Sequence, residues 1–342
     1  MTDLTYATLL QLRLEAARRL GCEIVPLDPE TGFLYELRYR GKTRLLHGGL
    51  SPLNDAVAAR IASDKFHTGL VVQAAGFRFP ASARCLRPGH FRSSEFDEHT
   101  GHEPARRFAK AHGFPLVIKP NRGSRGLDIT VAADGRAMEE AIDQVWKRDY
   151  LALVQTPVAG IDLRLDLLDG EFLFGYVRRP VTLEGDGRRT VRELLADLDP
   201  RFSGEAFERH LTGDEVWRRN AGPRGWRLDT LPEAGDRLVL KTPILNLNRL
   251  CLGERLAGID EAWLETCRTL SRRTHLRHIG IDFKVPDADA PPSLATVIEV
   301  KSSPSLAHMS RMGFAREALE AETRVVRAML DAVAAPALPG IG

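Results

Sequence analysis

The chain has 342 residues, of which 43% are hydrophobic and 27% are charged, a composition typical of soluble globular proteins. Its 48 lysines and arginines nearly balance 46 aspartates and glutamates, so a formal net charge of +2 argues against a general nucleic-acid surface. The four cysteines are scattered without C-x-x-C spacing, which argues against a zinc site or a disulfide framework.

The sequence predicts no membrane partner, because no apolar run approaches the ~18 residues that a spanning helix needs. Its first residues, MTDLT, lack the basic start and apolar core of a signal peptide. Together with the dispersed cysteines, this favours a cytoplasmic location. The near-balance of charge predicts no nucleic-acid partner.

The first predicted elements form a small α/β unit. Apolar residues at helical spacing predict a helix over residues 5–20, and residues 33–39 and 42–46 have the pattern of a β-hairpin. A single long helix is predicted over residues 54–75, where glycine ends it. We expect this unit to occupy residues 1–84.

Strands dominate the predictions for the middle of the chain. A helix over 103–112 precedes a buried strand at 116–119, and another strand is expected at 151–155. Residues 161–168 and 171–178 flank Asp169-Gly170, a hairpin signal because both turn positions accept a positive φ.

Two strand ends carry the chemistry. Residues 116–126 read LVIKPNRGSRG, so a strand ends at Lys119 and continues into a loop in which Gly123 and Gly126 let backbone N–H groups approach an anion. Lys119 would add a charge for phosphate oxygens. Residues 297–301 read VIEVK and bring Glu299 to a second strand end. A phosphate cradle and a carboxylate for magnesium indicate nucleotide chemistry.

Several segments in a fixed order give the chain a family resemblance. It resembles an ATP-grasp carboxylate–amine ligase, most closely the ATP-grasp portion of the cyanophycin synthetase branch and its peptide-ligase relatives. The matching segments lie at residues 54–65, 73–80, 114–120, 154–164, 178–194, 228–240, 279–282 and 298–299.

The resemblance implies an α+β architecture, the ATP-grasp fold. In this fold the N-terminal α/β unit is followed by a lid subdomain over 85–160 and a C-terminal metal-bearing subdomain over 161–331. A flexible tail is expected over 332–342.

The resemblance also implies the function. The expected activity is ADP-forming, ATP-dependent ligation of a carboxylate to an amine through an acyl phosphate, joining amino acids or short peptides. The implied partners are these small molecules, and a homodimer is compatible with the family. The alternative is a non-catalytic nucleotide-binding or partner-binding protein on a degenerate ATP-grasp fold.

The cofactors implied are ATP and Mg²⁺, and each has expected residues. The residues expected to bind the nucleotide are Lys65, Lys119, Asn121, Gly123, Ser124, Gly126, Gln155, Asp162 and Asn246. Those expected in catalysis are Arg164, Arg178 and Lys301, and those expected to hold the metal are Asp282 and Glu299. By pattern alone, Lys65 could be an ordinary surface lysine, and Asp162 and Arg164 could lie on a solvated strand face.

One position departs from the family, whose metal strand ends in Glu-x-Asn, whereas this chain has Glu299-Val-Lys301. Side chains alternate along a strand, so Glu299 and Lys301 share a face, as do Asp282 and Lys284 on a neighbouring strand. An ammonium cannot ligate a metal. Either Lys301 contacts phosphate directly and one metal remains, or the four side chains form an ion-pair network and activity is lost.

Overall fold

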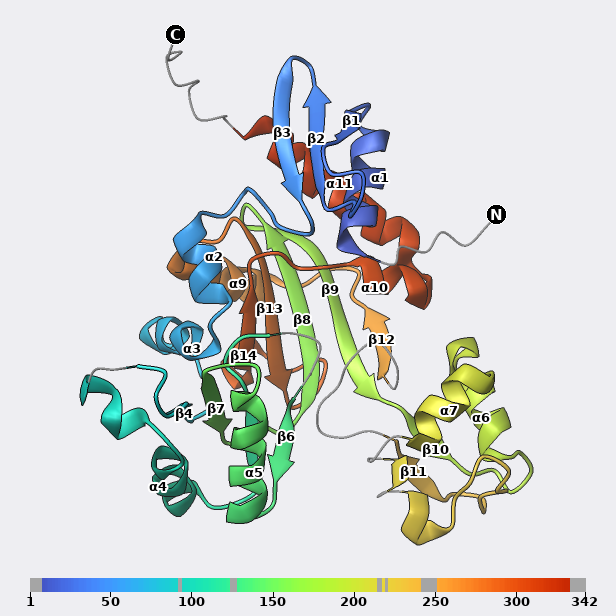
Figure 1. Cartoon of the computed structure of the whole chain (residues 1–342). Coiled ribbons are helices and arrows are strands. Elements are labelled where there is room, and N and C mark those ends of the chain that lie inside the picture. Colours follow the sequence, from blue (N-terminus) through green and yellow to red (C-terminus); the bar gives the residue numbers. More distant parts are fainter. Residues whose placement is uncertain are drawn as a thin grey trace. The chain divides into compact units, whose positions relative to one another are not determined.

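The computed structural model of the chain has two compact units (Figure 1). The first comprises Met1–Val177 with Arg255–Gly342, and the second comprises Arg178–Glu254. The structure describes residues 8–91, 94–123, 128–213, 217–218, 221–240 and 251–332. The finer subdomain boundaries expected after residues 84, 160 and 331 stay predictions.

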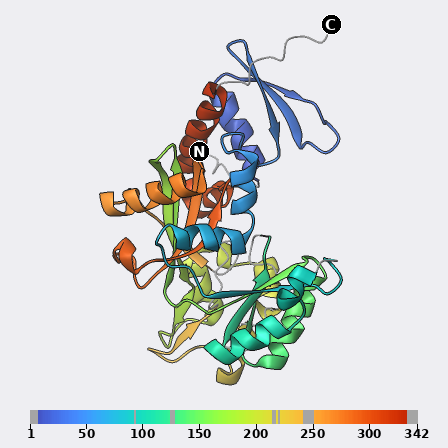
Figure 2. The ribbon, with the colours of Figure 1, turned by 90° about the vertical axis from the view of Figure 1, so that its left-hand side faces the viewer.

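The N-terminal part of the first unit combines a helix pair with a small sheet (Figure 2). Helix α1 (Leu9–Arg19) packs against α11 (Ala315–Asp331), and Arg13 Nε lies 2.6 Å from Glu322 Oε1 in an ion pair closed to solvent. The antiparallel strands are β1 (Glu23–Pro26), β2 (Leu34–Tyr39) and β3 (Lys42–His47). The predicted helix and hairpin are thereby confirmed.

The single helix predicted over residues 54–75 is wrong. The structure has two helices there, α2 (Ala56–Ala62) and α3 (Lys65–Ala74). Asp64 leaves the helical conformation, and its side chain accepts a hydrogen bond from His67 N, which caps a new helix. This break places Lys65 at the first position of α3 instead of on the side of a long helix.

A four-stranded antiparallel sheet follows, in the order β4-β7-β5-β6. Its strands are β4 (Ser82–Leu86), β5 (Leu116–Pro120), β6 (Thr130–Ala132) and β7 (Leu151–Gln155). Its helical elements are η1 (Ser94–His99), α4 (Glu103–His112) and α5 (Gly135–Trp146). Leu116 and Ile118 point into a core with Met138 and Ile142 of α5, so the side chain of Lys119 lies on the opposite face of β5.

The larger sheet has five strands in the order β12-β9-β8-β13-β14. These are β8 (Ile161–Leu168), β9 (Glu171–Pro180), β12 (Cys251–Arg255), β13 (His278–Val285) and β14 (Thr296–Lys301). Apolar residues of β8, β13 and β14 share one core with helix α9 (Glu261–Thr274). The predicted hairpin is confirmed, since Asp169 and Gly170 have φ angles of 53° and 82°.

The second unit has a core of its own. It contains β10 (Thr182–Glu184), α6 (Val191–Leu198), η2 (Pro200–Phe202), α7 (Glu205–Gly213), η3 (Gly222–Arg224) and β11 (Arg237–Val239). Trp217 and Trp226 are buried among its aliphatic side chains.

Short helices α10 (Ala307–Met309) and η5 (Ser310–Phe314) of the first unit precede α11, and η4 (Pro292–Leu294) precedes β14. Among the described residues, no helix has the length and apolar character to cross a membrane.

Candidate functional site

Three lysines from three different elements surround one carboxylate. Lys65 begins α3, Lys119 lies near the end of β5, and Lys301 ends β14. Glu299 Oε1 lies 3.4 Å from Lys65 Nζ, and Glu299 Oε2 lies 2.7 Å from Lys301 Nζ. The structure thus brings together four residues from three separate sequence motifs.

The loop after β5 is tied to the start of α3. Asn121 Oδ1 accepts a hydrogen bond from Phe66 N at 2.9 Å, and Asn121 O accepts one from Lys65 N at 3.2 Å. Lys65 Nζ in turn donates to Gly123 O at 2.9 Å. Lys65 is only 8% exposed, so the alternative that it is a surface lysine is wrong. Ser124 and Gly126 lie outside the described residues.

Lys119 is a buried lysine on which the carboxylates of Glu299 and Asp282 act electrostatically without forming an ion pair. Its side chain makes no hydrogen bond or ion pair with any residue the structure describes, and the residue is 6% exposed. Burial, reinforced by the charge of Lys65, lowers the pKa of Lys119 to about 8. Beside it, Asn121 Nδ2 is buried and lacks an acceptor within the described ranges. Both groups are donors that an anion would satisfy.

The carboxyl group of Glu299 remains ionised although burial disfavours its charged form. Burial acts to raise the pKa of its carboxyl group, but the ammonium groups of Lys301 and Lys65 outweigh burial and lower the pKa below its ordinary value. Glu299 therefore offsets part of the positive charge that the three lysines concentrate.

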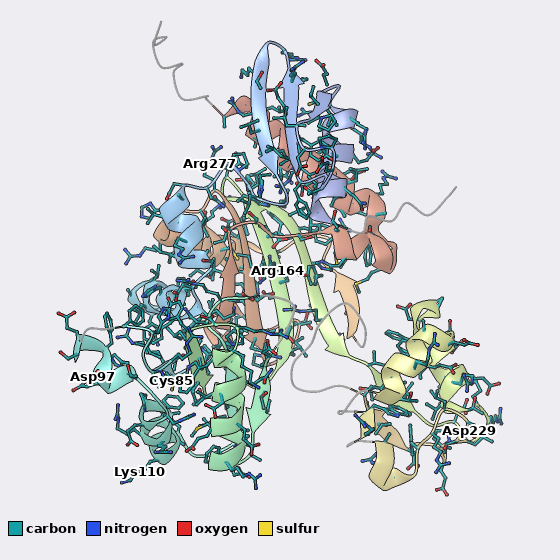
Figure 3. All side chains as sticks on the ribbon, in the orientation of Figure 1. Cys85, Asp97, Lys110, Arg164, Asp229 and Arg277 are labelled. Carbon is teal, nitrogen blue, oxygen red and sulfur yellow. The ribbon has the colours of Figure 1, made fainter. Side chains whose placement is uncertain are left out.

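Strands β13 and β14 pair as the sequence suggested, with Asp282 directly opposite Glu299. Asp282 Oδ2 accepts a hydrogen bond from Arg164 Nη1 at 2.9 Å, and Arg164 Nε donates to Asp166 Oδ1 at 2.5 Å. Arg164, labelled on the larger sheet in Figure 3, is 3% exposed, so the solvated-face alternative is wrong for it. On the same strand face, Asp162 pairs with Lys284 at 3.0 Å.

Asp166 and Gly280 belong to this arrangement and were missed by sequence reasoning. A Cβ atom on Gly280 would lie 1.9 Å from Arg164 Nη2, so the glycine makes room for the guanidinium. Asp166 could have been found, because it lies two residues after Arg164 on a strand and so shares its face. Gly280 could not, because its role depends on the register between β8 and β13, which pairs it with Asp166.

The remaining predicted residues are placed less completely. Gln155 ends β7, is 2% exposed, and donates from Nε2 to Ser82 Oγ at 2.8 Å. Arg178 is the first residue of the second unit, so its relation to these groups is not described. Asn246 lies outside the described residues.

Among the described residues, two carboxylates at this place could hold one magnesium ion. Mg²⁺ is commonly bound by one or two carboxylates together with substrate phosphates, and Asp282 and Glu299 lie opposite each other on neighbouring strands. Both are already paired with cations of the protein. No group of three histidines, cysteines, aspartates or glutamates that could hold a metal occurs among the described residues.

Comparison with known proteins places the chain beside two kinds of biosynthetic protein. It is 26% identical over 282 residues to cyanophycin synthetase of Crocosphaera subtropica, covering 79% of this chain and 31% of that protein. It is 28% identical over 289 residues to the glutathione biosynthesis bifunctional protein GshAB of Enterococcus faecalis, covering 82% of this chain and 36% of that protein. The chain thus spans about a third of the length of these curated relatives.

A solved structure shows the same fold. The bifunctional glutathione synthetase from Pasteurella multocida superimposes with a TM-score of 0.59 at 20% identity, covering 96% of this chain and 44% of that one. No family model matches the sequence.

Proposed function

We propose that this chain, a member of the ATP-grasp superfamily, is an enzyme that uses ATP to join a carboxylate to an amine. The predicted resemblance and the predicted α+β ATP-grasp fold are confirmed by the similarity to cyanophycin synthetase and the glutathione proteins and by the fold match. The further proposals are formation of an acyl phosphate and release of ADP, substrates that are amino acids or short peptides, and a cytoplasmic location.

The observation that carries the proposal is the buried ammonium of Lys119, which has no hydrogen bond or ion pair with any residue that the structure describes. Burying a cation without a partner is unfavourable, and an oxyanion at this position would relieve the cost. Lys65 and Lys301 add two more cations around the same carboxylate, which is more charge than Glu299 alone can balance. Several lysines that lie close together can bind the multiple negative charges of a polyphosphate.

In the proposed reaction, an oxygen of the substrate carboxylate attacks the γ-phosphorus of ATP. The bond from that phosphorus to the bridging oxygen breaks, and ADP leaves. The amine then attacks the acyl carbon, loses a proton, and expels inorganic phosphate. The lysines neutralise charge on the phosphoryl oxygens, and Arg164 supplies a fixed cation beside them. Residues 85–160 serve as a lid that limits access of water.

Magnesium belongs to the proposal as one ion. Asp282 and Glu299 would hold it together with phosphate oxygens, and it would supply additional positive charge there. We propose Arg178 as a further catalytic residue. The remaining proposed nucleotide contacts are Asn121, Gly123, Ser124, Gly126, Gln155, Asp162 and Asn246.

Glu299→Gln tests the metal role. If Glu299 contacts magnesium, the substitution should raise the magnesium concentration needed for half-maximal ADP release by about tenfold. Magnesium titrations of wild type and variant measure this, with Glu320→Gln, an exposed ion-paired glutamate, as the matched control. A lower melting temperature with an unchanged magnesium requirement would show that Glu299 acts only as an ion-pair partner.

The proposed function is tested by ADP release from the purified chain with ATP, magnesium and a pool of amino acids and dipeptides. Release that depends on the pool supports a ligase. The alternative is a nucleotide-binding protein without catalysis, and the cation partners already present on Asp282 and Glu299 are the observation that favours it. That alternative predicts ATP binding with no ADP release under any pool.

A further inference from the structure

We infer that Lys301 serves as a fixed cation that contacts a phosphate oxygen of the bound nucleotide and takes the place of a second protein-bound metal ion. This inference rests on the proposed function and adds a residue role and a metal stoichiometry to it.

The charge at the site favours this role. Among the described residues, four cations, those of Lys65, Lys119, Arg164 and Lys301, lie among three carboxylates, those of Asp166, Asp282 and Glu299. The neighbouring Asp162 and Lys284 neutralise each other. A surplus of positive charge remains before any metal arrives, so each added dication is repelled and an anion is attracted.

The geometry of Glu299 points the same way. Its two oxygens are both engaged by ammonium groups, Oε1 by Lys65 at 3.4 Å and Oε2 by Lys301 at 2.7 Å. A metal on this carboxylate would have to share an oxygen with one of these ammonium groups or displace it. The closer partner, Lys301, already supplies a positive charge at Glu299 Oε2.

The ammonium of Lys301 is accessible. The Lys301 side chain is 29% exposed and that of Glu299 is 20% exposed, so the ammonium can be reached by a ligand from solvent. Lys301 also lies close enough to Lys119 for its charge to act on that buried amine. The charges of Lys301 and Lys119 therefore act in one site.

The test counts metal ions per bound nucleotide. The intact chain is titrated with Mn²⁺ and a non-hydrolysable ATP analogue, free Mn²⁺ is followed by electron paramagnetic resonance, and nucleotide affinity is followed by calorimetry. We expect one Mn²⁺ per bound nucleotide in the wild type. For Lys301→Gln we expect nucleotide affinity at equimolar Mn²⁺ to fall about 10- to 100-fold, and millimolar Mn²⁺ to restore it as a second ion binds.

Two variants keep the experiment decisive. Lys301→Arg keeps the charge and should still bind a single Mn²⁺. Lys110→Gln removes an exposed lysine on α4, labelled in Figure 3, and should change neither affinity nor stoichiometry. Two Mn²⁺ ions per nucleotide in the wild type, or an unchanged affinity in folded Lys301→Gln, would overturn the role of Lys301 and leave the proposed function standing. No nucleotide binding by the wild type would overturn both.

Discussion

Lys119→Ala is expected to weaken ATP binding by about 10- to 100-fold without loss of stability in the ligand-free protein. A charge-assisted hydrogen bond to phosphate is worth about 1.5–3 kcal/mol. In the absence of ATP the same ammonium is buried without a partner among the residues that the structure describes, so its removal should leave the melting temperature unchanged or raise it. Calorimetric titration and thermal unfolding of the same two proteins measure both effects.

The pH dependence of ATP binding gives a sharper signature of Lys119. Burial lowers its pKa from 10.5 to about 8, so the free protein loses this proton as the pH rises above 8. Bound phosphate favours the ammonium form and raises the pKa, so ATP binding above pH 8 should take up a proton and weaken with rising pH. Calorimetry at pH 8.5 in two buffers of different ionisation enthalpy detects that proton.

The stability of the ligand-free protein should change with pH in the opposite direction to ATP affinity. Between about pH 8 and 10.5 the unfolded chain keeps a proton on Lys119 that the folded, ligand-free chain has lost, so the contribution of Lys119 to the free energy of unfolding rises with pH. The difference in stability between wild type and Lys119→Ala should therefore shrink over this window. A constant difference would mean that the pKa of Lys119 is not lowered in the free protein. If the difference does shrink, ATP binding without proton uptake at pH 8.5 would rule out Lys119 as the phosphate-binding amine.

Lys65→Ala is the natural comparison within the same site. Lys65 Nζ already has Gly123 O and Glu299 as partners, so its loss should weaken ATP binding in the same direction but by less. An effect larger than that of Lys119→Ala would mean that Lys65 is the principal phosphate contact.

Features with a short-range cause could be predicted from the sequence. The hairpin around Asp169-Gly170 follows from two residues that tolerate positive φ, and its two strands lie where alternation placed them. Glu299 and Lys301 share a strand face because the side-chain period of a strand is two. That Asp282 and Glu299 belong to neighbouring strands is implied by the family resemblance, whereas their position directly opposite each other depends on the register of β14 against β13.

Features that depend on distant partners could not be predicted in this way. The break between α2 and α3 occurs in an alanine-rich segment that favours a continuous helix, yet Asp64 caps a new helix whose first turn bonds to Asn121. Nothing within residues 54–75 reveals that partner. Gly280 and Arg164 are also far apart in sequence, and only the register of β13 against β8 brings them together.

Arg164→Ala should cost more stability than any other single substitution considered, about 3–5 kcal/mol, because it leaves two buried carboxylates without their shared cation. Asp166 is 1% exposed and Asp282 is 6% exposed. Burial already raises the pKa of Asp166, and the guanidinium of Arg164 opposes that rise. Without Arg164 the pKa of Asp166 should rise further, and the carboxyl group should bind a proton in the folded state at higher pH.

The loss of stability in Arg164→Ala should depend on pH. A carboxyl group whose pKa is raised by folding favours the folded state at low pH, and that contribution disappears as the pH rises through the folded-state pKa. The stability deficit of Arg164→Ala should therefore be smaller at pH 4 than at pH 7. Urea unfolding of wild type and variant at the two pH values measures it.

Gly280→Ala should reproduce part of the same loss with Arg164 still present. Its added methyl group would lie 1.9 Å from Arg164 Nη2, so the guanidinium must leave its position between the two carboxylates. Both substitutions remove the guanidinium of Arg164 from its position between the two carboxylates. The loss of stability in the double variant should therefore be smaller than the sum of the losses in the two single variants. Gly135→Ala is the matched control, since a Cβ there meets no atom within 4 Å. Full additivity of Arg164→Ala and Gly280→Ala would mean that Gly280 does not hold Arg164 in place.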